Sequence, residues 1–195
     1  MNKYKSLSTF KAIFALAGYL ALHHPAQAAT ELDTLAKQKI GAFSAELKAT
    51  LKQAISNGGP VKGIVACREE APLIAAKHSV DGWQIARRSD KNRNTANKPD
   101  SWEQQQIAKF AAALSSGADP ATLSSSEKSA TEYRFAKPIV MDTMCLACHG
   151  SYLGEDVKRA LKQHYPQDLA TGFSQGELRG IFSVKKQLPA LSRLM

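Results

Sequence analysis

The sequence predicts one domain of mixed α/β (α+β) class, and three observations support this prediction. Apolar residues recur at helical spacing over residues 31–56, which indicates a long helix near the N-terminus. Residues 133–136 alternate as in a strand, and residues 178–184 form a second strand-like segment. The chain of 195 residues also has no internal repeat and no linker long enough to separate two domains.

The N-terminal third predicts two helices in succession. In the first helix, the apolar positions at three- and four-residue steps are Ile40, Phe43, Leu47, Leu51 and Ile55. The stretch Asn57-Gly58-Gly59-Pro60 should end it. A second helix is expected over residues 61–77, and Pro72 should break or kink it.

A short strand at residues 83–86 is followed by a basic loop that extends to Lys98. Asp100 or Ser101 should cap the next helix, whose apolar face contains Trp102, Ile107, Phe110 and Leu114. Residues 115–129 are rich in Ser, Ala and Gly, and we expect them to form a surface loop.

The C-terminal third contains the most distinctive stretch of the chain. Pro138 should end the strand at residues 133–136 or mark an edge of the sheet. The following sequence, MCLACHG (residues 144–150), is expected on a short helix. A helix over residues 155–164, closed by Pro166, should precede the strand at residues 178–184.

The first 28 residues have the features of a secretory signal peptide. Three lysines precede an apolar segment, residues 12–22, that is too short to span a bilayer, and Ala26-Gln27-Ala28 matches a cleavage site. Cleavage before Ala29 would leave residues 29–195 as one domain and lower the formal charge from +9 to +6. We expect a periplasmic protein without a membrane span, whose basic charge serves solubility or anionic partners rather than nucleic acid.

The motif Cys145-Leu-Ala-Cys148-His149 is typical of covalent haem attachment. Two thiols on one turn can bond the haem vinyl groups, and the adjacent imidazole can bind the iron. Bacterial haem c is attached outside the cytoplasm, which agrees with an export signal. The motif therefore predicts one covalently attached haem c, with His149 as the proximal iron ligand.

Two alternatives use the same residues. A zinc site would need a fourth ligand, although adjacent Cys and His side chains diverge and no second ligand pair is evident; the candidates are Cys67, His78 and His164. A redox dithiol of the thioredoxin type usually lies near the start of its domain, whereas this Cys-x-x-Cys lies late in the chain.

The sequence alone does not decide which residue binds the iron on the side opposite His149. Met141 and Met144 lie too close to the motif in sequence, and Met195 is the last residue. His78, His164 and Cys67 remain candidates. Cys67 is notable because an exported free thiol needs a partner, and a thiolate ligand would favour ferric iron and give a low-potential centre.

Four stretches make the sequence similar to a known family. They are VACREEAP, RRSDKNRNTANKPDSWE, YRFAKPIVMDTMCLACHG and YPQDLATGFSQGELRGIFSV, which together extend from about residue 65 to residue 184. The chain resembles the single-haem c-type cytochromes with a PAS-like fold, long catalogued as a domain of unknown function. That family includes secreted proteins and extracytoplasmic sensor modules.

The resemblance implies a PAS-like antiparallel sheet with flanking helices and a long N-terminal helix. It also implies iron ligation by His149 on one side and Cys67 on the other. Where the family usually has proline after the Arg-Asn pair, this chain has Thr95, which touches no expected ligand.

The basic residues around the predicted haem suggest contacts to its two propionates. Bidentate pairing is possible for Arg87, Arg88, Arg93 and Arg179. We expect a redox or gas sensor that acts with a separate signalling or redox partner; the alternative is a low-potential electron-transfer cytochrome. No acid–base constellation indicates an enzyme, and phosphate-binding and metalloprotease motifs are absent from the sequence.

Overall fold

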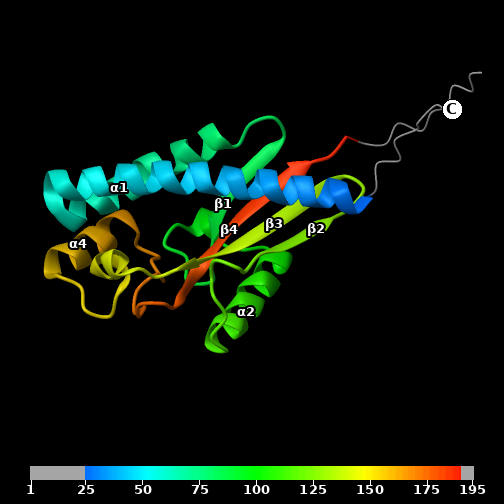
Figure 1. Cartoon of the computed structure of the whole chain (residues 1–195). Coiled ribbons are helices and arrows are strands. Elements are labelled where there is room, and N and C mark those ends of the chain that lie inside the picture. Colours follow the sequence, from blue (N-terminus) through cyan, green and yellow to red (C-terminus); the bar gives the residue numbers. More distant parts are fainter. Residues whose placement is uncertain (1–24, 190–195) are drawn as a thin grey trace, which may run out of the picture.

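The computed structural model describes residues 25–189 and confirms the mixed helix and strand class (Figure 1). Its centre is a four-stranded antiparallel sheet in the order β1-β4-β3-β2. The strands are β1 (Trp83–Arg88), β2 (Ser125–Lys128), β3 (Glu132–Val140) and β4 (Leu178–Gln187). The antiparallel sheet and the long N-terminal helix agree with the expectation, while the PAS-like assignment stays a prediction.

Helix α1 (Pro25–His78) is a hairpin of two helical arms. The turn lies at Gly58 and Gly59, and Gly59 has a φ of 71° and a ψ of −170°, a combination that is essentially restricted to glycine. The second arm returns along the first (Figure 1), so that Glu46 accepts hydrogen bonds from both Lys77 and His78. The glycine stretch therefore reverses the chain.

The expected break at Pro72 is wrong, because the second arm continues to His78. Pro72 itself is exposed, while its neighbours Ala71 and Ile74 are buried against the rest of the molecule. The burial of these side chains holds the arm in place despite the one backbone hydrogen bond that proline cannot donate.

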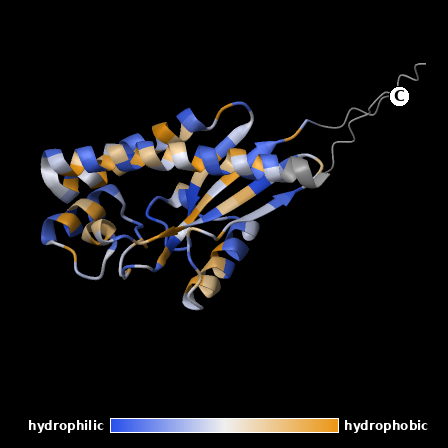
Figure 2. Cartoon of the chain, in the orientation of Figure 1, coloured by the Kyte–Doolittle hydropathy of each residue, from blue (hydrophilic) through white to orange (hydrophobic). Residues whose placement is uncertain are grey.

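Both faces of the sheet are covered by helices. On one face, α1 contributes Ala36, Ile40, Phe43 and Ile74 to a core shared with Trp83, Ile85, Tyr133, Phe135 and Val184. On the other face, α2 (Ser101–Ser115) packs Ile107 and Phe110 on Ala136 and Ile181. Figure 2 accordingly shows hydrophobic and hydrophilic residues mixed along the inner strands. Alternation along the strands thus assigns residues to the α1 face or the α2 face, up to the register shift between Ile139 and Val140.

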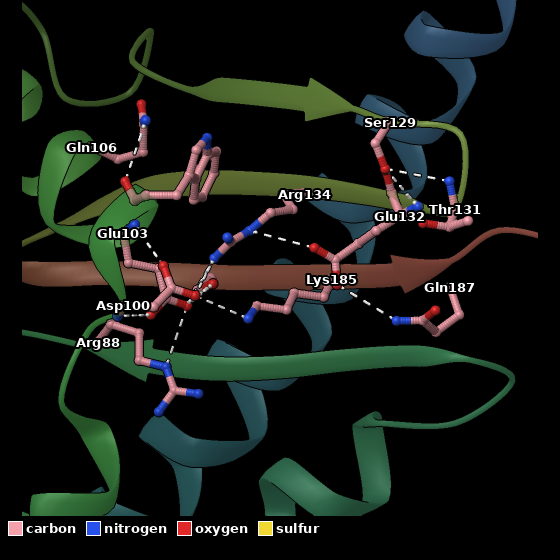
Figure 3. Close-up of polar contacts among 12 residues, drawn as sticks. Arg88, Asp100, Glu103, Gln106, Ser129, Thr131, Glu132, Arg134, Lys185 and Gln187 are labelled. Carbon is pink, nitrogen blue, oxygen red and sulfur yellow. Dashed lines mark hydrogen bonds and ion pairs between the residues drawn. The ribbon is translucent and has the colours of Figure 1, made fainter.

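The predicted cap of α2 is confirmed at Asp100, which forms a capping box with Glu103. Glu103 is fully buried and accepts hydrogen bonds from Ser183 and Arg88, while Asp100 pairs with Arg134 and Lys185 (Figure 3). These contacts join α2 to three strands of the sheet.

The expected loop at residues 115–129 is partly wrong, because it contains β2. This strand is polar and largely exposed, and in the described part of the chain it pairs only with residues 133–136 of β3. Pro138 lies beyond that pairing, where β3 contacts β4 alone, so the edge position expected for this proline is confirmed among the described strands.

The remaining helices are short, and α4 lies beside the turn of the α1 hairpin (Figure 1). They are η1 (Thr95–Asn97), η2 (Thr143–Cys145), α3 (Leu146–His149) and α4 (Glu155–His164). Of the predicted signal segment, residues 1–24 lie outside the described residues, and α1 begins at Pro25. Within residues 25–189, no helix has the length and apolar character needed to cross a membrane.

Candidate functional site

The Cys-x-x-Cys-His motif forms a compact turn made of η2 and α3. Asp142 starts the turn by accepting a hydrogen bond from the Thr143 N–H, and the Cys145 N–H donates to the Asp142 carbonyl. Cys145 packs against Met141, Ala170 and Phe173. Cys148 faces another cluster, built from α1 and α4, that includes Ile64, Val157, Ala160, Leu161 and Tyr165. The two thiols are therefore directed to different apolar surroundings.

His149 is fixed by a hydrogen bond from its ring to the loop that follows α4. Its Nδ1 lies 2.7 Å from the carbonyl oxygen of Ala170. A carbonyl can only accept, so Nδ1 carries the proton and Nε2 keeps its lone pair. Phe173 packs edge-on against the imidazole, with 6.4 Å between ring centroids.

The surroundings of His149 keep its imidazole neutral. Burial lowers the pKa of His149 to about 2, and the nearby guanidinium groups of Arg93, Arg179 and Arg87 act in the same direction. The hydrogen bond to Ala170 opposes these effects only in part. A neutral imidazole with a free Nε2 is the form that binds a metal ion.

Cys67 faces the motif from the second arm of α1. It belongs to the helical stripe Ile64, Cys67, Ala71 and Ile74, whose other members are all buried. Ile64 contacts the α4 cluster and Ile74 the main core, so half-buried Cys67 lies between these two regions.

Cys67 affects the pKa values of residues in and beside the motif. Burial raises the pKa of Cys148, Arg93 lowers it, and Cys67 and Cys145 raise it further. Burial also raises the pKa of Tyr165 to about 12, with a second contribution from Cys67. The fold therefore brings the thiol of Cys67 into the electrostatic neighbourhood of Cys148 and Tyr165.

The other candidate iron ligands are occupied elsewhere or lie apart. His78 pairs with Glu46 at 2.8 Å inside the α1 hairpin, and Nδ1 of His164 lies 3.0 Å from Arg68. Met141 is buried under the motif, Met144 is exposed, and Met195 lies outside the described residues.

The zinc and dithiol alternatives find little support in this geometry. Among the described residues, no group of three or more His, Cys, Asp or Glu side chains converges as a metal ion requires. The three cysteines carry free thiols, and Cys145 and Cys148 contact separate clusters.

The four candidate arginines have different environments. Along β1, Arg87 shares the α1 face with Trp83 and Ile85, whereas Arg88 lies on the opposite face and donates to Glu103. For Arg87, no hydrogen bond or ion pair is found within residues 25–189. Its position leaves it available to an anionic ligand.

Arg93 and Arg179 both lie beside His149. Arg93 binds Asp168 and two backbone carbonyls, while Arg179 donates to Ser89 and to the Lys91 carbonyl and lies over the Phe173 ring. Burial lowers the pKa of Arg179 to about 10, and the charges of Arg93 and Arg87 add to this effect. Three arginines thus make a strongly positive environment for an anionic ligand.

Three residues of the 165–177 loop were not predicted as part of the site. Asp168 holds Arg93, Ala170 provides the carbonyl for His149, and Phe173 packs on its ring. The loop is also bonded along the motif, since the N–H groups of Gly172 and Phe173 donate to the carbonyls of Gly150 and His149. The family resemblance included this stretch, but nothing in the residue types marked a backbone carbonyl as a partner of His149.

Comparison with known proteins identifies the family of the chain and a similar structure. A family model described as Tll0287-like matches residues 23–186. The chain belongs to the Tll0287-like family. The structure of this Tll0287-like chain resembles the crystal structure of the cyanobacterial heme-protein Tll0287, with 20% sequence identity and a TM-score of 0.59. The match covers 80% of this chain and 96% of that one, and it shows a shared fold. No curated protein sequence matches the chain.

Proposed function

We propose that this chain is a haem-binding, cytochrome-like protein. One observation carries the proposal: Cys67 lies in an otherwise buried stripe facing the motif, whose His149 is held with Nε2 free. The shared fold with a heme-protein supports the same conclusion. In this proposal, Cys145 and Cys148 would attach one haem c, and His149 and Cys67 would bind its iron.

The residues present suit this group. The two motif thiols are free, and the surrounding clusters offer apolar surface from Ile64, Leu161 and Phe173. Arg87 and Arg179 lie near His149 and are the proposed partners of the haem carboxylates, whereas Arg88 faces α2. A bound haem would supply a one-electron Fe(III)/Fe(II) couple.

We further propose that the protein is exported to the periplasm and acts as a redox or gas sensor rather than as an enzyme. Cys67 belongs to a helical arm that contacts both the motif and the main core. A change at Cys67 would therefore be transmitted to the packing of that arm, where a separate protein partner could detect it. The alternative function is a low-potential electron carrier, in which both axial ligands stay in place.

Absorption spectra test this proposal. The mature protein, made with the haem-attachment machinery, is compared with the variant Cys67→Ser in the ferric and ferrous states. We expect a covalent haem with a thiolate-type ferric spectrum that C67S abolishes, because serine cannot provide a thiolate. The matched control is His164→Gln, which removes another candidate ligand and should leave the spectrum unchanged.

Each other result has a definite meaning. The absence of covalent haem would contradict the proposal. A ferric spectrum with two nitrogen ligands that is unaffected by C67S would remove Cys67 from the iron and favour electron transfer. A change in ligation on reduction supports sensing, whereas unchanged ligation with fast electron exchange supports a carrier.

A further inference from the structure

The guanidinium of Arg93 has several polar partners inside the protein, all of them at Nε and Nη2. Its Nε lies 3.1 Å from Asp168 Oδ1, and its Nη2 lies 3.1 Å from Asp168 Oδ2. The same Nη2 is 2.6 Å from the Cys148 carbonyl oxygen and 3.2 Å from that of Ala170. Both charged side chains are nearly buried, with exposed fractions of 10% for Arg93 and 9% for Asp168.

The Ala170 carbonyl is the point where Arg93 and His149 meet. It accepts from His149 Nδ1 at 2.7 Å and from Arg93 at 3.2 Å. Asp168 Oδ1 also accepts from the Ala170 N–H at 2.8 Å, which fixes the backbone on the other side of the same residue. The carbonyl that orients the imidazole is therefore held by the Arg93–Asp168 pair.

These contacts have two consequences of the same sign for a metal bound at Nε2. A carbonyl that already accepts from a guanidinium is a weaker acceptor for the imidazole, which limits electron donation through His149. Compared with a neutral side chain at position 93, the guanidinium also favours the state of the metal centre with the lower positive charge, and Asp168 offsets part of this effect. Both effects stabilise the reduced state.

We propose that Arg93 is a positioning residue for His149 and not a propionate ligand. Anchored by Asp168, it holds the Ala170 carbonyl and the end of α3. It also shifts the ferric/ferrous equilibrium of the iron toward ferrous. This inference rests on the proposed haem function. This role differs from a purely structural one. Because Arg93 and its anchor Asp168 carry opposite charges, their replacement should shift the ferric/ferrous equilibrium in opposite directions.

Midpoint potentials of the haem-loaded protein test the charge effect. We expect Arg93→Gln to shift the ferric/ferrous equilibrium about tenfold toward ferric, equivalent to about 59 mV for one electron. Asp168→Asn should shift it about threefold toward ferrous, because it leaves the arginine charge uncompensated. Arg93→Lys, which keeps the charge but not the forked geometry, should recover part of the R93Q effect.

The control is Arg159→Gln on the exposed side of α4, which removes the same charge away from His149. Shifts of the same sign for R93Q and D168N, or shifts no larger than that of R159Q, would overturn the proposal.

A second readout does not depend on haem. The ring nitrogen chemical shifts of His149 are recorded by NMR on the full chain made without the attachment machinery. The wild type should hold the Nδ1–H tautomer alone, and R93Q should show a mixture of tautomers as the carbonyl loses its anchor. Identical tautomers in both would overturn the positioning role. A wild-type chain that never binds haem but shows this dependence on Arg93 would instead contradict the proposed function and leave the positioning role standing.

Discussion

Glu103 and Asp100 place two carboxylates at the start of α2, and each has several cationic or hydrogen-bonding partners. Glu103 is 1% exposed and accepts from Ser183 Oγ at 2.6 Å and from the Asp100 N–H at 2.8 Å. Asp100 pairs with Arg134 at 2.6 Å and with Lys185 at 3.1 Å. A buried carboxylate is stable only when its lost hydration is replaced in this way.

Asp100 should make the stability of the protein dependent on pH at acid values. Burial raises its pKa, but the Glu103 N–H, Lys185 and Arg134 outweigh burial and lower the pKa to about 2. Because this pKa is below the value of about 4 for an unfolded aspartate, the contribution is complete above that pH and is lost as pH falls toward 2. Asp100→Asn should lower the free energy of unfolding by up to about 1 kcal/mol at pH 7. It should also reduce the loss of stability between pH 4 and pH 2.

Urea unfolding at a series of pH values measures this effect. The control is Glu127→Gln on exposed β2, which should preserve the wild-type dependence on pH. If D100N retained the full loss of stability between pH 4 and pH 2, other carboxylates would have to be responsible.

At the scale of elements, the α1 hairpin decides where Cys67 lies. The two arms are joined through Gly58 and Gly59, and Gly63 packs so closely that an added Cβ would lie 2.9 Å from Ile55. Glycine at these positions allows the reversal and the close approach of the arms. The angle of the second arm, and with it the position of Cys67, follows from this turn.

Replacing Gly59 should destabilise the protein and disturb the site. Gly59→Ala forces a side chain into a backbone region that only glycine adopts readily, at a cost of about 1–3 kcal/mol. Gly41→Ala is the matched control, because an added Cβ there meets nothing within 4 Å and alanine favours a helix by up to about 1 kcal/mol. The midpoint temperature of thermal unfolding should therefore fall for G59A and rise for G41A. Equal shifts in the two variants would contradict this account of the turn.

The elements that could be predicted from sequence are those with periodic apolar residues. Helices α2 and α4 and strands β3 and β4 fall close to the expected positions, because each buries one regular face. Strand β2 was missed because its residues, SSEK, are polar and held by pairing with β3 alone. The helix through Pro72 depends on tertiary burial of Ala71 and Ile74, which a local proline rule does not include.

For the candidate site, the motif residues are predicted from their spacing and Cys67 from the family resemblance, and their binding of haem stays a prediction. The partner of His149 could not, because a backbone carbonyl is present at every residue and only the fold selects that of Ala170. The different roles of Arg87, Arg88 and Arg93 likewise depend on which face of β1 or which loop presents them.

At the scale of the whole molecule, the site lies outside the sheet core. The main core joins α1 to the sheet, whereas Cys148 packs on a smaller cluster of Ile64, Val157, Ala160, Leu161 and Tyr165. Within residues 25–189, only the second arm of α1 contributes buried side chains to both. A small satellite cluster with its own helix can open without unfolding the sheet.

Leu161→Ala tests this separation of the two regions. Truncating this buried side chain should lower the stability of the small cluster by about 2–5 kcal/mol. Hydrogen exchange should therefore accelerate in α3, α4 and residues 60–70, while β3 and β4 keep their protection because their core is intact. The matched variant Ile107→Ala, in the cluster beneath α2, should instead accelerate exchange in α2 and leave α4 unchanged. Equal acceleration throughout the sheet in L161A would show that the molecule opens as one unit, and movement of the second arm would then have to involve the sheet.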